Sequence, residues 1–97
     1  MPTAEVLAIL SEIFEVDVAE FSRRRHDSPL RAVAARCLIR YAGLSQRDVA
    51  DLLDVGSGAA VCNQLKRLLD KVAADRRLRR RVEQAEKRLA GRRRINR

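Results

Sequence analysis

The sequence has few of the residues on which several protein classes depend. Its 97 residues include two cysteines, Cys37 and Cys62, one histidine, His26, no tryptophan and only 3 % aromatic residues. Because the cysteines are far apart and form no Cys-x-x-Cys pair, we expect neither a zinc site nor a disulfide scaffold. No apolar run approaches the roughly 18 residues of a membrane span, and the N-terminal segment lacks the basic stretch of a signal peptide. The expectation is a reduced cytoplasmic protein with no cofactor, no metal and no membrane contact.

Residues that could carry catalysis are also scarce. Cys37 and Tyr41 fall on an apolar stripe and are expected in the core, and nothing in the sequence places a base beside the partly exposed Cys62. His26 has no second histidine to act with, and no glycine-rich phosphate-binding loop is present. The sequence therefore predicts a protein that is not an enzyme.

Positive charge is plentiful, but it is unevenly distributed. The chain has 21 Lys and Arg against 13 Asp and Glu, a net charge of +8. Residues 1–22 contain no Lys or Arg and carry −5, so residues 23–97 carry +13. A surplus of this size indicates a polyanionic partner, and a membrane surface is disfavoured because basic membrane helices carry bulky aromatics. We expect a nucleic-acid partner and a nucleoid-associated location.

Helical periodicity dominates the rest of the chain. Glycine and proline total six, and alternating β-branched runs are absent. Asp17 is expected to cap a short turn, Ser28 and Pro29 to begin a helix, and Gly43 to end it. A last helix is expected to begin after Asp75. We predict an all-α fold, a compact bundle of about six helices forming one domain over residues 1–91, with Gly91 ending the last helix before a basic tail over 92–97.

The apolar positions of these helices predict the core. The expected inward positions are Val6, Leu7, Leu10, Ile13 and Phe14 in the first helix, then Leu30, Val33, Ala34, Cys37, Leu38 and Tyr41, then Val49, Leu52 and Leu53, then Val61, Leu65, Leu68, Leu69 and Val72, and finally Leu78, Val82, Ala85 and Leu89.

Residues 44–69 have a helix-turn-helix pattern. Ser45 and Asp48 are spaced as a capping box, and Ser57 can cap the following helix after the turn Asp54-Val55-Gly56. Gly56 is expected where this turn needs a residue without a Cβ atom, or where the chain comes close to DNA. The major groove of B-DNA admits one helix, whose first turns then face the base edges. The second helix is therefore expected to face duplex DNA.

The outward positions of that second helix suggest individual contacts. They are Gly58, Ala59, Cys62, Asn63, Lys66 and Arg67. Asn63 can bind adenine or a phosphate, Ala59 and Ala60 can contact a thymine methyl, and the two cations are placed for phosphates. The loop Arg23-Arg24-Arg25 is expected to contact phosphates too. The arginine runs of the last helix, Arg76-Arg77 and Arg79-Arg80-Arg81, are instead expected to form a solvated face paired with Glu83 and Glu86.

These residues resemble a known domain. The run GLSQRDVADLL at 43–53 resembles the first helix of the C-terminal DNA-binding domain of the bacterial replication initiator DnaA, and residues 60–61 and 66–68 resemble its second helix. Residues 69–91 are more similar to the related domain of transposases of REP elements, relatives of the insertion-sequence 200 family. The resemblance covers residues 5–90 and implies a Trp-repressor-like all-α fold that binds double-stranded DNA, as a detached transposase-type or initiator-type domain.

The resemblance also implies contact residues. The family's basic loop, which approaches phosphates and the minor groove, falls on Arg23, Arg24, Arg25 and Arg31, and its base-reading segment falls on 57–60. The initiator's Arg-Asp-His-Thr-Thr type signature is replaced here by residues 56–60, GSGAA, so its target sequence is not expected to transfer. The full predicted DNA-binding set is Arg23, Arg24, Arg25, Arg31, Ser45, Arg47, Ser57, Gly58, Ala59, Ala60, Asn63, Lys66 and Arg67.

Two alternatives remain at this point. One is a helical protein-interaction module whose acidic first helix is the docking face. The other is binding of structured RNA, which the charge permits although stacking aromatics are missing.

Overall fold

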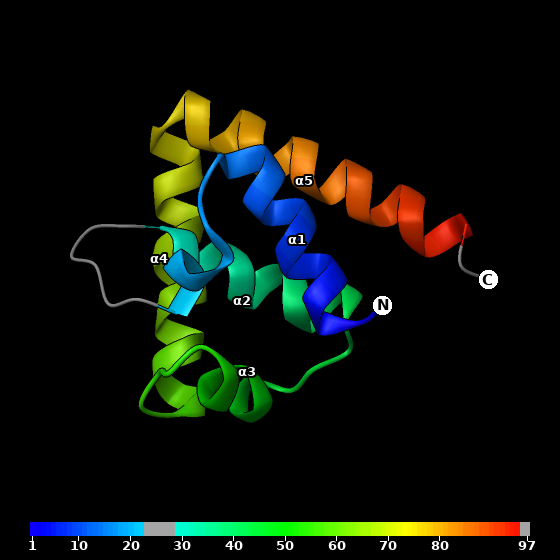
Figure 1. Cartoon of the computed structure of the whole chain (residues 1–97). Helices are drawn as coiled ribbons and strands as arrows, with labels where there is room; N and C mark the ends of the chain where they lie inside the picture. Colours follow the sequence, from blue (N-terminus) through cyan, green and yellow to red (C-terminus); the bar gives the residue numbers. More distant parts are fainter. Residues whose placement is uncertain (23–28, 96–97) are drawn as a thin grey trace.

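The computed structural model describes residues 1–22 and 29–95, with side chains as far as residue 92. It confirms the all-α prediction, and within these residues the chain forms five α-helices and one 3₁₀-helix (Figure 1). The elements are α1 (Thr3–Phe14), η1 (Val18–Ser22), α2 (Leu30–Tyr41), α3 (Gln46–Leu52), α4 (Gly58–Ala74) and α5 (Arg76–Ile95).

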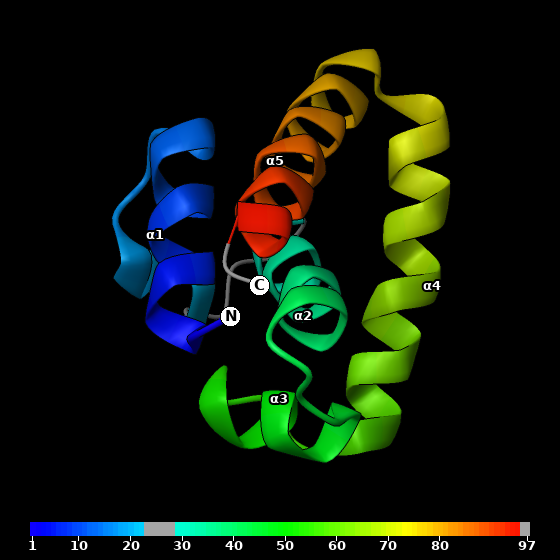
Figure 2. The same ribbon diagram turned by 90° about the vertical axis from the view of Figure 1, so that its right-hand side faces the viewer.

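Helix α2 occupies the centre of the molecule. The other four α-helices all contact it, and α1 lies beside α5 (Figures 1 and 2). Helix α3 lies at one end of α4, and α5 begins at the opposite end (Figure 1). The two ends of α4 are therefore in different surroundings, one beside α3 and the other beside α5.

Three of the predicted helix starts are confirmed by side-chain caps. The Ser45 hydroxyl accepts from Asp48 N–H at 3.1 Å while the Asp48 carboxylate accepts from Ser45 N–H at 3.1 Å, a complete capping box. The Ser57 hydroxyl accepts from Ala60 N–H at 3.2 Å at the start of α4. The Asp75 carboxylate accepts from two backbone N–H groups at the start of α5. These bonds satisfy donors that the first turn of a helix otherwise leaves open.

Helix ends agree with the sequence at one glycine and differ at two others. Gly43 has φ +72° after α2, as expected of a residue that ends a helix. Gly91 does not end the last helix, because α5 continues to Ile95. Gly56 has no positive φ and open space where a Cβ would be, and the left-handed residue of this turn is Asp54, with φ +56°. The prediction that the turn needs glycine at position 56 is therefore wrong.

The buried core matches most of the predicted apolar positions. Cys37 and Tyr41 are buried, as are the four expected residues of α5. Two leucines differ: Leu52 is 44 % exposed and Leu69 is 60 % exposed. On α3 the small Ala50 is buried in place of Leu52. Both leucines lie at the edge of an apolar stripe, where the neighbouring helices rather than the periodicity decide which side chain is covered.

Candidate nucleic-acid interface

The connection between α3 and α4 is held by a side chain from α2. Arg31 donates from Nη2 to the carbonyl oxygen of Asp54 at 2.7 Å. That carbonyl belongs to the residue with left-handed backbone, so the bond fixes the point where the chain turns from α3 towards α4. Arg31 is a predicted phosphate contact, and the structure uses one of its guanidinium nitrogens inside the fold.

Helix α3 presents its capping residues and one cation. Ser45, Arg47 and Asp48 are all exposed. Hydrogen bonds from the Ser45 backbone N–H and hydroxyl lower the pKa of the Asp48 carboxyl below its ordinary value of 3.8. The hydroxyl of Ser45 also accepts a hydrogen bond from the Asp48 N–H. Arg47 is the one cation of α3.

Helix α4 carries a row of exposed side chains near its start. Ala59, Asn63, Lys66 and Arg67 are all exposed, and spacings of three and four residues place them on neighbouring parts of one helix face. The next exposed residue along this row is acidic, Asp70. The exposed cations of this face therefore lie within about the first three turns of α4, and the next cation along it, Lys71, is half-buried.

Other predicted positions on α4 are less accessible. Ala60 is half-buried and packs against the core, so Ala59 is the more accessible of the two alanines. Gly58 is half-buried beside α3, where an added Cβ would lie 3.8 Å from the Cβ of Gln46, an ordinary contact distance. Cys62 is half-buried as well. The predicted residues Arg23, Arg24 and Arg25 lie outside the described residues, as do His26 and Ser28.

The acidic first helix is neutralised by the last one. Three arginines of α5 make ion pairs with acids of the α1 segment: Arg81 with Glu15 at 3.8 Å, Arg88 with Glu12 at 2.6 Å and Arg92 with Glu5 at 2.5 Å. The sequence predicts that the runs at 76–77 and 79–81 pair with Glu83 and Glu86, and that prediction is wrong: among the described residues only Arg81 of these runs has an ion pair, and its partner is Glu15. Steps of seven and four residues place the three arginines on the side of α5 that faces α1.

Glu86 instead connects α5 to the central helix. Its Oε1 atom accepts from Arg36 Nε and Arg40 Nη1, both at 3.0 Å, and its side chain is 19 % exposed. Tyr41 adds a hydroxyl bond to the Glu86 carbonyl at 3.4 Å. The sequence reasoning missed this role, because a glutamate in a basic helix gives no signal of which neighbouring helix it faces.

The exposed cations at the start of α5 lie away from α3. Within the described part of the chain, no ion pair involves Arg76, Arg77, Arg79 or Arg80. The start of α5, which carries these arginines, lies beside the end of α4 that is opposite α3 (Figure 1). They therefore form a separate basic region and do not extend the row on α4.

Residues 1–22 and 29–95 can be compared with the requirements of a metal site and of a membrane-spanning helix. No group of three or more His, Cys, Asp or Glu side chains in these residues is arranged to hold a metal ion. No helix among them combines the length and apolar character needed to cross a membrane. No protein-family model, curated protein or solved structure matches the chain.

Proposed function

We propose that this protein binds double-stranded DNA, with α3 and α4 acting as a helix-turn-helix. The observation that carries the proposal is the exposed row on α4, which begins at a serine-capped helix start and combines Ala59, Asn63, Lys66 and Arg67. A helix that enters the major groove presents the residues of its first turns to base edges, where Asn can bind adenine and Ala can contact a thymine methyl, and nearby cations can contact phosphates. The row contains these residue types.

The charge distribution supports the same proposal. Glu5, Glu12 and Glu15 of the α1 segment form ion pairs with arginines of α5, and the side chains of Glu12 and Glu15 remain 65 % and 80 % exposed. These pairs offset part of the negative charge of the α1 segment, which favours DNA binding over docking through α1. The protein as a whole carries a net charge of +8, and a positive charge of this size attracts a polyanion such as DNA.

The residues of the proposed interface have separate tasks. Asn63 is the side chain of the row that can make a bidentate contact with adenine, while Lys66 and Arg67 contact phosphates. Arg47 reaches the backbone from α3, and Arg31 positions the connection through its bond to the Asp54 carbonyl. The loop Arg23-Arg24-Arg25 supplies further phosphate contacts in this proposal.

Salt dependence tests the electrostatic part. If the basic loop and α4 together neutralise about five phosphates, log affinity for a duplex falls with log salt at a slope of about −4 to −5. A slope near zero would remove the DNA proposal. Replacing Arg23, Arg24 and Arg25 by alanine should weaken binding to all sequences alike, since phosphate contacts carry little sequence information.

A matched pair of substitutions tests whether α4 faces DNA. Ala59→Glu places a carboxylate on the exposed row, and we expect duplex binding to be lost. The same change at the exposed Ala73 alters net charge equally but lies about 20 Å further along α4, so it should bind nearly as well as the wild type. An acid in the first turn favours the helix dipole, so Ala59→Glu should fold normally. Native affinity of Ala59→Glu would show that α4 does not face DNA.

Substitutions at two further positions separate base recognition from phosphate binding. Asn63→Ala should relax preference at one base pair by about 1–3 kcal/mol while leaving the salt slope nearly unchanged. Arg67→Ala should reduce the slope by about one unit without changing preference. Duplex RNA of the same sequence is the control ligand, because its deep, narrow major groove does not admit a helix. Equal affinity for duplex RNA would contradict the groove-binding mode.

A further inference from the structure

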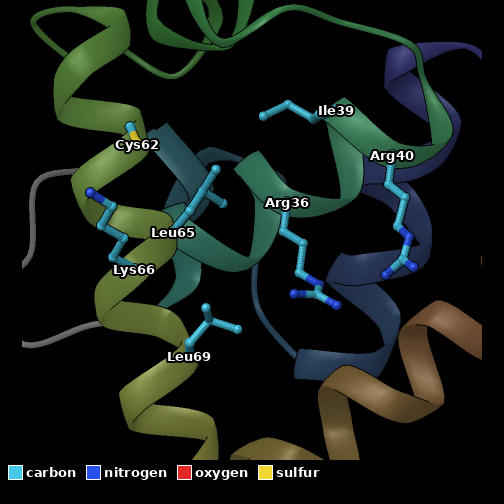
Figure 3. A pocket seen from close by; sticks show the side chains of 7 residues that line it. All are labelled: Arg36, Ile39, Arg40, Cys62, Leu65, Lys66 and Leu69. Carbon is cyan, nitrogen blue, oxygen red and sulfur yellow. The ribbon is translucent and has the colours of Figure 1, made fainter.

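A groove with an apolar floor lies between α2 and α4, and of the residues proposed to contact DNA only Lys66 lines it. It has a volume of about 340 Å³, and its apolar floor is formed by Ile39 from α2 and Leu65 and Leu69 from α4, with Cys62 beside them (Figure 3). Leu69 is 60 % exposed, the largest exposed fraction among the large apolar side chains of the described residues. Exposed apolar surface gathered in a groove is typical of a contact site, whereas single exposed leucines are ordinary.

The apolar surface continues towards α5. A second depression, of about 250 Å³, shares Arg36 and Leu69 with the groove and extends to Val72 on α4 and Val82 on α5. Its charged lining is mixed, with Arg79 beside Glu83 and Glu86, so the surplus of positive charge lies at the groove itself. From Cys62 to Val72 the surface follows α4 for about 15 Å. That length matches roughly three turns of a helix laid along α4, which can place apolar residues at i, i+3 or i+4, and i+7.

The rim of the groove is positively charged. Arg36, Arg40 and Lys66 line it, and no acidic residue does. Glu86 from α5 binds Arg36 and Arg40 through one oxygen atom. The bond from Arg36 uses Nε, so the terminal nitrogens of Arg36 can donate hydrogen bonds to an occupant of the groove. An occupant with apolar residues on one face and carboxylates at its edges is complementary to both floor and rim.

We propose that this groove binds a short amphipathic helix of another protein, with leucine-like residues on its buried face and Asp or Glu along its edges. The proposal does not rest on DNA binding, although Lys66 borders both surfaces. It also differs from docking through the acidic α1, because here the protein supplies the cations and the partner supplies the acids.

Selection from a peptide library tests the proposal directly. The immobilised full-length protein is exposed to displayed helical peptides of about fourteen residues, four helical turns, with randomised sequence. We expect the enriched peptides to combine apolar residues at i, i+3 or i+4, and i+7 with flanking acids. A fluorescent copy of an enriched peptide then gives the affinity by anisotropy.

Two leucine variants locate the binding surface. Leu69→Glu should weaken the peptide by roughly tenfold or more, since it removes apolar contact and repels the acids. Leu52→Glu is the matched control, because Leu52 is 44 % exposed and lies on α3 outside the groove. It should bind the peptide as the wild type does. Bound peptide should also slow alkylation of Cys62 several-fold, since this thiol lines the groove.

Several results would overturn the proposal. Enrichment of basic peptides, equal peptide affinity of Leu69→Glu and wild type, or no protection of Cys62 would each do so. A wild-type dimer in sedimentation that Leu69→Glu dissociates would assign the groove to a second copy of this chain instead. Duplex DNA affinity is measured directly in Leu69→Glu and wild type; equal values leave the DNA proposal intact whatever the peptide does, so the two proposals fail separately.

Discussion

Asp54 is one of two non-glycine residues with left-handed backbone in the described part of the chain, the other being Glu15. Its φ of +56° is left-handed, a conformation that most residues with a Cβ adopt only at a cost, although Asp and Asn tolerate it. Its carbonyl accepts the Arg31 bond that joins α2 to the turn. A single residue thus fixes how α4 leaves α3, and with it the direction of the row that is proposed to meet DNA.

The change in stability on substituting Asp54 should depend on how well the new residue tolerates the left-handed backbone, and not on its charge. Asp54→Val should lower the free energy of unfolding by about 1–2 kcal/mol, because a β-branched side chain opposes the left-handed conformation. Asp54→Asn should change it by less than about 0.5 kcal/mol, since asparagine accepts this backbone. Urea unfolding of both variants measures the difference. Equal stability of the two would mean that the turn does not depend on this conformation.

The Asp48 carboxylate makes the start of α3 sensitive to pH. Its pKa is lowered in the folded protein by hydrogen bonds from Ser45, so its contribution to stability is fully present above the ordinary value of 3.8. The contribution is lost as pH falls through the lower folded-state pKa. Asp48→Asn should therefore be less stable than the wild type at about pH 6, and the two should converge towards about pH 2.

Thermal unfolding across this pH range measures the convergence. Asp51→Asn is the control, because Asp51 is exposed on the same helix and outside the capping box. Subtracting the effect of Asp51→Asn removes the general effect of losing a charge. A constant difference between wild type and Asp48→Asn at all pH values would contradict the role of the ionised carboxylate.

At the scale of elements, the end of α1 depends on one arginine of α5. Arg81 donates from Nη1 to the Phe14 carbonyl at 3.2 Å, stands 6.0 Å from the centre of the Phe14 ring and pairs with Glu15 at 3.8 Å. The carbonyls in the last turn of a helix lack partners within that helix, and a cation there also complements the dipole. Arg81 therefore connects two helices that are far apart in the sequence.

A neighbouring arginine provides the control for this contact. Arg81→Ala should lower the free energy of unfolding by about 0.5–1.5 kcal/mol, a range kept modest because the side chain is 46 % exposed. Arg80→Ala removes the same charge from the next position, which is exposed, and should change stability by less than about 0.5 kcal/mol. Equal losses in both variants would show that overall charge and not the contact with α1 is responsible.

At the scale of the whole molecule, the reactivity of Cys62 should report on the native surface and that of Cys37 on global unfolding. Cys37 is fully buried in α2 at the centre of the bundle, and burial, reinforced by Glu86, raises the pKa of its thiol to about 12. Cys62 is half-buried in the groove. An alkylating reagent needs an exposed thiolate, so Cys62 should react in the native protein and Cys37 only after global unfolding.

Alkylation of single-cysteine variants measures this difference. In Cys62→Ser, labelling of Cys37 at about pH 8 should be slow and should accelerate with urea in parallel with global unfolding. In Cys37→Ala, labelling of Cys62 should depend little on urea below the unfolding transition. Rapid labelling of Cys37 in native buffer would mean that the bundle opens locally around α2.

The sequence by itself determined the secondary structure and most of the core, because these depend on local signals. Ser45, Ser57 and Asp75 cap helices as their positions predict, since a cap involves only residues within three positions. The apolar period of α5 likewise predicted its buried residues. Most of the exposed row of α4 was also predicted from the sequence, because its residues lie outside the apolar stripe of that helix.

Only the tertiary structure decided which faces were covered and which charges were paired. The adjacent Leu52 and Leu53 look alike in the sequence, yet one is 44 % exposed and the other 2 %, because covering a stripe edge depends on a neighbouring helix. Three arginines of α5 pair with acids of the α1 segment more than sixty residues away, and Glu86 pairs with two arginines of α2. The groove floored by Leu69 exists for the same reason: α2 and α4 meet there without a further helix to cover it, and no local pattern records how distant helices pack.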